Sequence, residues 1–166
     1  MIVVSDTSPL SGLAIVNQLS LLKLLYGQVV IPPAVADELR RGGQDDVRIT
    51  EAMTMDWLTV GSCSDDGLVS ELQTTYRLDR GESEAIALAL EMKADALLID
   101  ERLGRREASR LGLSITGVMG VLLASKRQNL VESVQPIVDN LIREAGFRIS
   151  RQLYAEVMIA AGEQVD

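Results

Sequence analysis

The chain has 166 residues, of which 47% are hydrophobic and 24% charged, and its formal net charge is −8. It contains no histidine and a single cysteine, Cys63. These counts exclude Ser-His-Asp and Cys-His catalysis, histidine-based metal sites and any disulfide within the chain. Carboxylates are therefore the groups left for enzyme chemistry, and oxygen ligands of this kind suit Mg²⁺ or Mn²⁺.

The length and the charge set further limits. The length favours one domain over residues 1–166. The negative net charge and the 3% of aromatic residues argue against a general nucleic-acid binder, which needs a basic surface and stacking rings. No apolar run approaches the roughly 18 residues of a membrane span. Met1 leads directly into a short apolar stretch without the pattern of a signal peptide, so we expect a cytoplasmic protein.

Short apolar segments alternate with segments of helical periodicity along the chain. The strands are predicted at 2–4, 29–31, 57–60, 94–99 and 113–115, with 57–60 at the sheet edge. The helices are predicted at 10–16, 19–25, 34–41, 47–55, 68–76, from 81 onward, 101–111, 117–126, 131–144 and 150–161, with a loop at 42–46. This alternation predicts an α/β fold, in which helices cover both faces of a parallel sheet through right-handed crossovers.

The stretch from Gly81 to Asp100 combines an amphipathic helix with a buried strand. On a helical wheel of about 100° per residue, Glu82 lies in the middle of the apolar stripe, whereas Glu84 falls near 200° and should face water. Asp79 is a suitable N-cap for this helix. A carboxylate directed at the core, such as that of Glu82, is costly unless it is paired, protonated or bound to a metal.

Two apolar strands end in aspartate, at Asp6 and at Asp100, and Glu38 lies beside the apolar stripe of another helix. If the two strands are neighbours in a parallel sheet, both aspartates lie at the same edge, where the first turn carrying Glu82 also arrives. Four acids in one pocket raise each other's pKa unless a cation lies among them. This grouping favours metal-assisted hydrolysis of a phosphodiester or a phosphate monoester.

Each of these acids also has a structural interpretation. Asp6 and Asp100 could cap the helices that follow them, Glu38 could be a solvated helix residue, and Glu82 could interact only with the helix dipole. Asp37 and Glu84 are predicted to be surface residues. The arginines of the 101–111 helix are either solvated or, in the case of Arg102 and Arg105 (or Arg106), directed at a substrate phosphate.

Several segments together resemble one known family. They are the strand followed by Asp-Thr-Ser-Pro-Leu, then IPPAVADEL, GESEAIALAL, ADALLIDERLGR and the FRIS…LY segment. The resemblance is to the PIN-domain superfamily, in particular to its VapC-like branch with a DTSPL-type N-terminal motif. It implies a three-layer α/β/α fold and Mg²⁺- or Mn²⁺-dependent ribonuclease activity. It also implies a homodimer that acts as the toxin of a toxin–antitoxin pair, inhibited by a small antitoxin protein.

Carried onto this sequence, the family's metal-binding acids are Asp6, Glu38, Asp100 and, counting back from Asp100, Glu82 in place of the more usual aspartate. The leading hypothesis is a metal-dependent endoribonuclease with these four residues as catalytic metal ligands. Thr7 and Ser8 would steady Asp6 or a metal-bound water next to the substrate, and Arg102 and Arg105 would bind the RNA.

Three other interpretations remain open. A receiver-like signalling domain also gathers aspartates around Mg²⁺, but the central phosphoacceptor aspartate and the later lysine are not evident. A catalytically silent PIN scaffold would act only through a protein partner. A phosphatase of the haloacid type is less well supported, because Ser8 stands where that type has its second aspartate.

Overall fold

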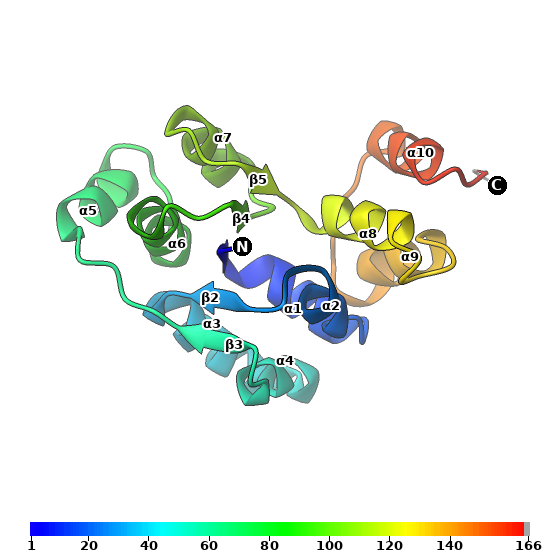
Figure 1. Ribbon diagram of the computed structural model, residues 1–166, viewed down its shortest axis with the longest axis horizontal. Coiled ribbons are helices and arrows are strands. Elements are labelled where there is room, and N and C mark those ends of the chain that lie inside the picture. Colours follow the sequence, from blue (N-terminus) through cyan, green and yellow to red (C-terminus); the bar gives the residue numbers. More distant parts are fainter. Residues whose placement is uncertain (165–166) are drawn as a thin grey trace.

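The computed structural model describes residues 1–164, and in this part of the chain a five-stranded parallel sheet has the order β3-β2-β1-β4-β5. The strands are β1 Val3–Ser5, β2 Val29–Ile31, β3 Leu58–Val60, β4 Ala96–Leu98 and β5 Ile115–Thr116. Helices cover both faces of the sheet (Figure 1). The predicted α/β/α fold class is confirmed, and β3 lies at an edge of the sheet as expected. The last two residues of the predicted domain lie outside the described part.

The helices alternate with the strands along the chain. They are α1 Thr7–Ile15, α2 Ser20–Tyr26, α3 Pro33–Asp45, α4 Val47–Glu51, the 3₁₀ turn η1 Ala52–Thr54, α5 Asp66–Thr74, α6 Arg80–Met92, α7 Arg102–Arg110, α8 Val118–Arg127, α9 Gln135–Glu144 and α10 Arg151–Ala160. Helices α5, α6 and α7 pack on one face of the sheet, and the other helices build the core on the opposite face. None of the helices described in residues 1–164 has the length and apolar character needed to cross a membrane.

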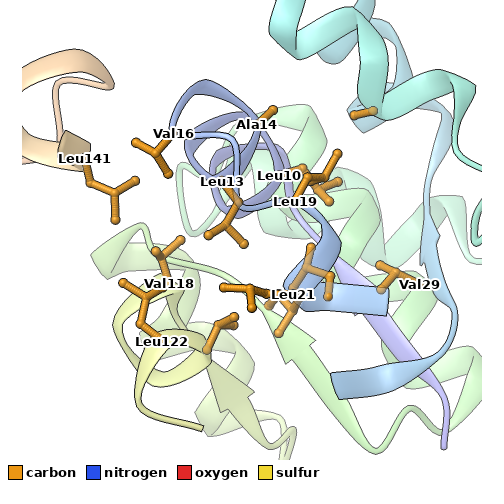
Figure 2. Close-up of a cluster of buried hydrophobic side chains, with 14 of the residues drawn as sticks. Leu10, Leu13, Ala14, Val16, Leu19, Leu21, Val29, Val118, Leu122 and Leu141 are labelled. Carbon is orange, nitrogen blue, oxygen red and sulfur yellow. The ribbon is translucent and has the colours of Figure 1, made fainter. Parts of the chain in front are cut away.

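The two cores follow from the alternation of side chains along each strand. Val3 and Leu98 belong to the cluster beneath α1, α2 and α8, whereas Val4, Leu97 and Ile99 belong to the cluster beneath α6. Successive strand residues face opposite sides of a sheet, so a strand covered on both faces is apolar throughout. Figure 2 shows the larger cluster, in which Leu13 of α1 and Leu21 of α2 lie opposite Val118 and Leu122 of α8, and Leu141 of α9 lies beside Val16.

The predicted loop at 42–46 is wrong, because α3 continues to Asp45. The reason is the packing of α4 against this last part of α3. A Cβ added at Gly42 would lie 3.4 Å from Ile49, and one at Gly43 would overlap the side chain of Thr50. The two glycines therefore let α4 approach closely, and this contact outweighs the low helix propensity of glycine.

The strand order creates a switch point at the carboxyl ends of β1 and β4. From β1 the chain passes to β2 and β3 on one side, whereas β4 and β5 lie on the other side. The loops that leave β1 and β4 start helices on opposite faces of the sheet, α1 and α7. A crevice opens where such loops diverge, and ligands of open α/β sheets bind in crevices of this kind.

Candidate functional site

The two aspartates that follow β1 and β4 lie at this switch point. The β1 and β4 strands pair directly, with Ser5 opposite Leu98, and the backbone N–H of Asp6 donates a hydrogen bond of 2.9 Å to the Leu98 carbonyl oxygen. Asp100 accepts hydrogen bonds from the Val118 amide at 2.9 Å and from the Ser8 hydroxyl at 3.4 Å. The structure therefore places Asp6 and Asp100 at the same sheet edge. The capping interpretation is not supported, because Asp6 makes no side-chain cap to α1, Glu101 caps α7, and Asp100 instead binds the first amide of α8.

Glu82 is held at the start of α6 by a reciprocal capping box. Asp79 accepts a hydrogen bond of 2.7 Å from the Glu82 amide, and Glu82 accepts one of 3.1 Å from the Asp79 amide. The Asp-x-x-Glu spacing forms this arrangement locally, so the predicted N-cap at Asp79 is confirmed. Glu82 is only 6% exposed, as the helical wheel predicted. Its carboxylate is thus fixed at the amino end of a helix, next to the sheet edge.

Glu38 reaches the same place from α3, on the other side of the sheet edge. Its carboxylate accepts a hydrogen bond of 2.7 Å from the Thr7 hydroxyl. A Cβ added at Gly81 would overlap the Glu38 carboxylate. Glycine at this position of α6 therefore allows α3 and α6 to approach each other, and the approach places Glu38 beside the first turn that carries Glu82.

The four predicted acids line a single cavity of about 500 Å³. We call it the acid cavity, and its walls include Asp6, Glu38, Glu82, Asp100, Thr7 and Ser8. Three further charged residues line it: Asp79, which the sequence indicated only as a helix cap, Glu101 and Arg148. The position of Glu101 directly after Asp100 already indicated that it could support a metal site indirectly. Arg148 belongs to the turn between α9 and α10, and nothing in its local sequence indicates that the turn folds back over the cavity.

The four predicted acids of the cavity hold their protons more tightly than usual, because their pKa values are raised. Burial raises the pKa of Asp6 to about 8, against a hydrogen bond from the Thr7 amide that lowers it, and the charges of Glu82, Asp79 and Glu38 raise it further. Burial and then the Asp79 charge raise the pKa of Glu82 to about 7. Burial also raises the pKa values of Glu38 and Asp100. A cation among these groups would favour their charged forms.

The donor chemistry of the cavity suits a divalent metal, although the acids do not form a tight cluster. In residues 1–164, no three histidine, cysteine, aspartate or glutamate side chains are arranged to hold a metal ion as they stand. Instead Glu38, Glu82 and Asp100 each accept a hydrogen bond from the protein itself. Carboxylate oxygens are nevertheless the ligands that Mg²⁺ and Mn²⁺ prefer. The residues fit such an ion if their side chains turn inward, toward the cavity that they share.

The hydroxyls next to Asp6 contact different acids from those we expected. We predicted that Thr7 and Ser8 would steady Asp6 or a metal-bound water, whereas their hydroxyls bind Glu38 and Asp100. Each of these bonds connects the first turn of α1 to another element. The start of α1 therefore orients two of the four acids of the cavity.

The arginines of α7 differ in whether they lie near the acid cavity or on the exposed surface of the helix. Arg105 donates a hydrogen bond of 2.8 Å to the Ile99 carbonyl oxygen and lines a second cavity, which shares Asp100 with the acid cavity. Arg102 and Arg106 are exposed on the surface of α7. Of the predicted RNA-binding pair, Arg105 is thus the residue that the structure places beside a catalytic candidate.

The prediction that Glu84 faces water is wrong. Glu84 is 7% exposed, accepts a hydrogen bond of 3.0 Å from the Ala34 amide and pairs with Arg80 at 2.6 Å. The helical wheel assumed one buried face, but α6 is covered by the sheet and also by α3 and α5. Glu84 therefore meets the amino end of α3. Asp37 is exposed as predicted and pairs with Arg40 at 3.1 Å.

A family model described as a PIN domain matches residues 2–163. The chain belongs to the PIN domain family. A search of curated proteins returned no match. PIN domains are generally nucleases and typically use divalent metal ions, which agrees with the carboxylates of the acid cavity and removes the receiver-like and haloacid-phosphatase alternatives.

Proposed function

We propose that this PIN domain is a metal-dependent endoribonuclease that hydrolyses RNA phosphodiester bonds. The observation that carries the proposal is the meeting of Asp6, Glu38, Glu82 and Asp100 in one cavity at the switch point of the sheet. Neither histidine nor a cysteine nucleophile is available at this place. Two of these carboxylates, Asp6 and Glu82, are buried and the other two are half-buried, which is a costly arrangement. A divalent cation is the partner that would stabilise their charged forms.

The four acids would hold Mg²⁺ or Mn²⁺, with Asp6 and Asp100 as the ligands from the strand ends. When bound, the ion would lower the pKa of a water and neutralise charge on the phosphate. Hydrolysis forms a bond between the water oxygen and phosphorus and breaks the bond to the leaving oxygen, which takes up a proton. Glu82, which the capping box fixes at the wall of the cavity, is the carboxylate that would accept the proton of the attacking water.

The remaining residues of the cavity would position these groups and the substrate. Thr7 and Ser8 orient Glu38 and Asp100 through their hydroxyls. Arg148 lines the acid cavity and would bind the scissile phosphate by charge-assisted hydrogen bonds. Arg105 and Arg102, on α7, would bind RNA beyond it.

The test is cleavage of a mixed, structured RNA by the purified protein in Mg²⁺ or Mn²⁺ and in EDTA. We expect cuts that require the metal and that disappear in Asp6→Asn and Asp100→Asn, while circular dichroism shows an unchanged fold. Asp37→Asn, a change to an exposed acid outside the acid cavity, is the matched control and should cut like the parent. Metal-dependent cleavage that persists in Asp6→Asn would contradict the proposal.

The proposal extends to the biological setting. We propose that the protein is a homodimeric toxin of a toxin–antitoxin pair in the cytoplasm, inhibited by a small antitoxin. The support is the resemblance of its N-terminal motif to the VapC-like branch. Induced expression should arrest growth, and Asp6→Asn should abolish the arrest. Arrest by both proteins would instead favour the silent scaffold. Light scattering of the purified protein tests the dimer.

A further inference from the structure

The turn between α9 and α10 supplies the positive charge of the acid cavity. Within residues 1–164, Arg148 is the one basic side chain that lines this cavity, where it faces six carboxylate side chains: Asp6, Glu38, Asp79, Glu82, Asp100 and Glu101. The Arg148 side chain is exposed and forms neither a hydrogen bond nor an ion pair with the described part of the chain. Its guanidinium is therefore free to bind a ligand that enters the cavity.

The backbone of this turn has a defined shape. The amides of Ala145 and Phe147 both donate hydrogen bonds of 3.1 Å to the Leu141 carbonyl oxygen. Gly146, between them, has a φ of +72°, a left-handed conformation that glycine adopts without strain. These bonds end α9 and direct the following residue, Phe147, back toward α1. Because Arg148 comes next in the chain, its backbone position follows that of Phe147.

The ring of Phe147 lies directly against the backbone of Gly12. A Cβ added at Gly12 would lie 2.7 Å and 2.9 Å from two carbons of the ring and 3.4 Å from the Leu141 side chain. Gly12 is in the interior of α1, where glycine is an unfavourable residue. The close approach of the ring gives a reason for glycine at this position, since any larger residue would push Phe147 away.

The same helix also orients the acids. Ser8, in the first turn of α1, donates a hydrogen bond to Asp100. Gly12 lies four residues later, about one helical turn along, and therefore on the same face of α1. The contact between Gly12 and Phe147 thus fixes the distance between Arg148 and the acids, because one rigid element carries both the hydroxyl that binds Asp100 and the surface that receives the ring.

We propose that Phe147 is a positioning residue: through its contact with Gly12 it holds Arg148 where the guanidinium binds the scissile phosphate. The inference rests on the proposed function, since it concerns the phosphate that the acid cavity would cut. An exposed arginine has many rotamers, and a fixed backbone limits the region that its guanidinium can reach. A misplacement of about 1 Å can lower a rate roughly 100-fold, so the place of this cation matters for catalysis.

The test is a double-mutant cycle between Gly12 and Arg148, measured as single-turnover cleavage of the structured RNA in Mn²⁺. Arg148→Gln removes the charge and should lower the rate roughly 100-fold. Gly12→Ala displaces the ring and should lower the rate roughly tenfold. The double variant should be no slower than Arg148→Gln alone, because moving a turn that no longer carries the cation has no further effect. Arg151→Gln, a change to an exposed arginine in the first turn of α10, is the matched control and should cut like the unmodified protein.

The position of the ring can be followed without any activity, because Phe147 is the one phenylalanine of the chain. Protein labelled with ortho-fluorophenylalanine gives a single ¹⁹F resonance and leaves the tip of the ring unmodified. We expect Gly12→Ala to move this resonance and Arg148→Gln to leave it in place. In the uncleaving Asp6→Asn protein, the affinity for a labelled ten-nucleotide RNA should show the same non-additive losses. If alanine at position 12 prevents folding, Phe147→Leu, which withdraws the ring but stays apolar, replaces it in both cycles.

Losses that multiply in the double variant, to roughly 1000-fold, would overturn the positioning role, because they would show that the two residues act independently. A ¹⁹F resonance that Gly12→Ala leaves unmoved would also overturn it. The nuclease proposal fails separately. No metal-dependent cleavage by the unmodified protein would reject the nuclease, and the binding cycle and the ¹⁹F resonance would then decide the role of Phe147. Cleavage with multiplied losses would reject the positioning role alone.

Discussion

The hydroxyl of Thr7 donates a hydrogen bond of 2.7 Å to the carboxylate of Glu38, so the turn after β1 orients an acid that belongs to α3. The contact joins two of the four elements that build the acid cavity. Because the donor is a side chain next to Asp6, the position of Glu38 depends on the sequence at the end of β1.

Replacing Thr7 tests this orientation. Thr7→Val removes the hydroxyl and keeps the volume, so we expect cleavage to fall about 10- to 100-fold, the usual cost of losing a group that orients a metal ligand. Thr7→Ser keeps the donor and should retain most of the activity. The measurement is initial cleavage rates as a function of Mn²⁺ concentration. Equal rates for the valine and serine variants would show that the bond has no part in catalysis.

Gly81 offers a test of the approach of α3 to α6. Alanine at this position would drive its Cβ into the Glu38 carboxylate, so we expect Gly81→Ala to displace Glu38 and to lower cleavage at least tenfold, given the sensitivity of catalysis to small misplacements. Gly67→Ala, at the same second position of α5, is the matched control, since its Cβ would meet Asp65 at an ordinary 3.5 Å. Full activity of Gly81→Ala would contradict the crowded geometry.

The raised pKa of Asp6 predicts how stability changes with pH in the absence of metal. The folded protein holds this proton up to about pH 8, whereas an unfolded aspartate loses it near its ordinary pKa of 3.8. Between these values the folded state binds more protons than the unfolded state, so the free energy of unfolding falls as the pH rises from about 4 to about 8.

Thermal unfolding in EDTA over this pH range is the measurement. Asp6→Asn should flatten the decline and be about 1–2 kcal/mol more stable than the unmodified protein at pH 8, because a buried, repelled charge has been removed. Added Mn²⁺ should stabilise the unmodified protein but have a smaller effect on the variant. A stability that rises with pH in EDTA would show that Asp6 is not held in its protonated form.

Glu82 and Glu84 are both buried, but we expect a catalytic role for Glu82 and a structural role for Glu84. Glu84→Ala leaves the Ala34 amide without its acceptor, so we expect a loss of about 1–3 kcal/mol of stability with cleavage largely retained once the protein is folded. Glu82→Gln keeps an oxygen for the Asp79 amide and should cost little stability but remove most of the activity. Chemical denaturation and cleavage rates of the two variants check this contrast, and a reversal of the two patterns would exchange their roles.

Much of the fold could be predicted because the strands carry strong local signals. A run such as Leu97-Leu98-Ile99, apolar on both faces and ended by Asp100, is typical of an inner parallel strand. The same logic placed Asp6 and Asp100 at one sheet edge, and the helical wheel located Glu82. The continuation of α3 through Gly42 and Gly43 was missed, because it depends on the packing of α4 rather than on local propensity.

The remaining parts of the site depend on contacts between distant segments. Glu84 is buried because α3 packs against the first turns of α6. A helical wheel drawn for α6 alone does not show this contact. Arg148 reaches the acid cavity because the turn after α9 folds back, with the ring of Phe147 so close to Gly12 that an added Cβ would lie 2.7 Å from it. No residue spacing in the sequence indicates these two contacts between distant segments, so only the structure reveals them.

The measurement that tests the central claim most directly is the anomalous scattering of a crystal soaked in Mn²⁺. We predict a peak inside the acid cavity with carboxylate oxygens of Asp6 and Asp100 at the roughly 2.0–2.2 Å expected of ligands to such an ion, and with Glu38 or Glu82 turned toward it. The peak should be absent in Asp6→Asn. No peak in the cavity at saturating Mn²⁺, or one bound only by residues outside it, would contradict the assignment of these acids as the metal site of a nuclease.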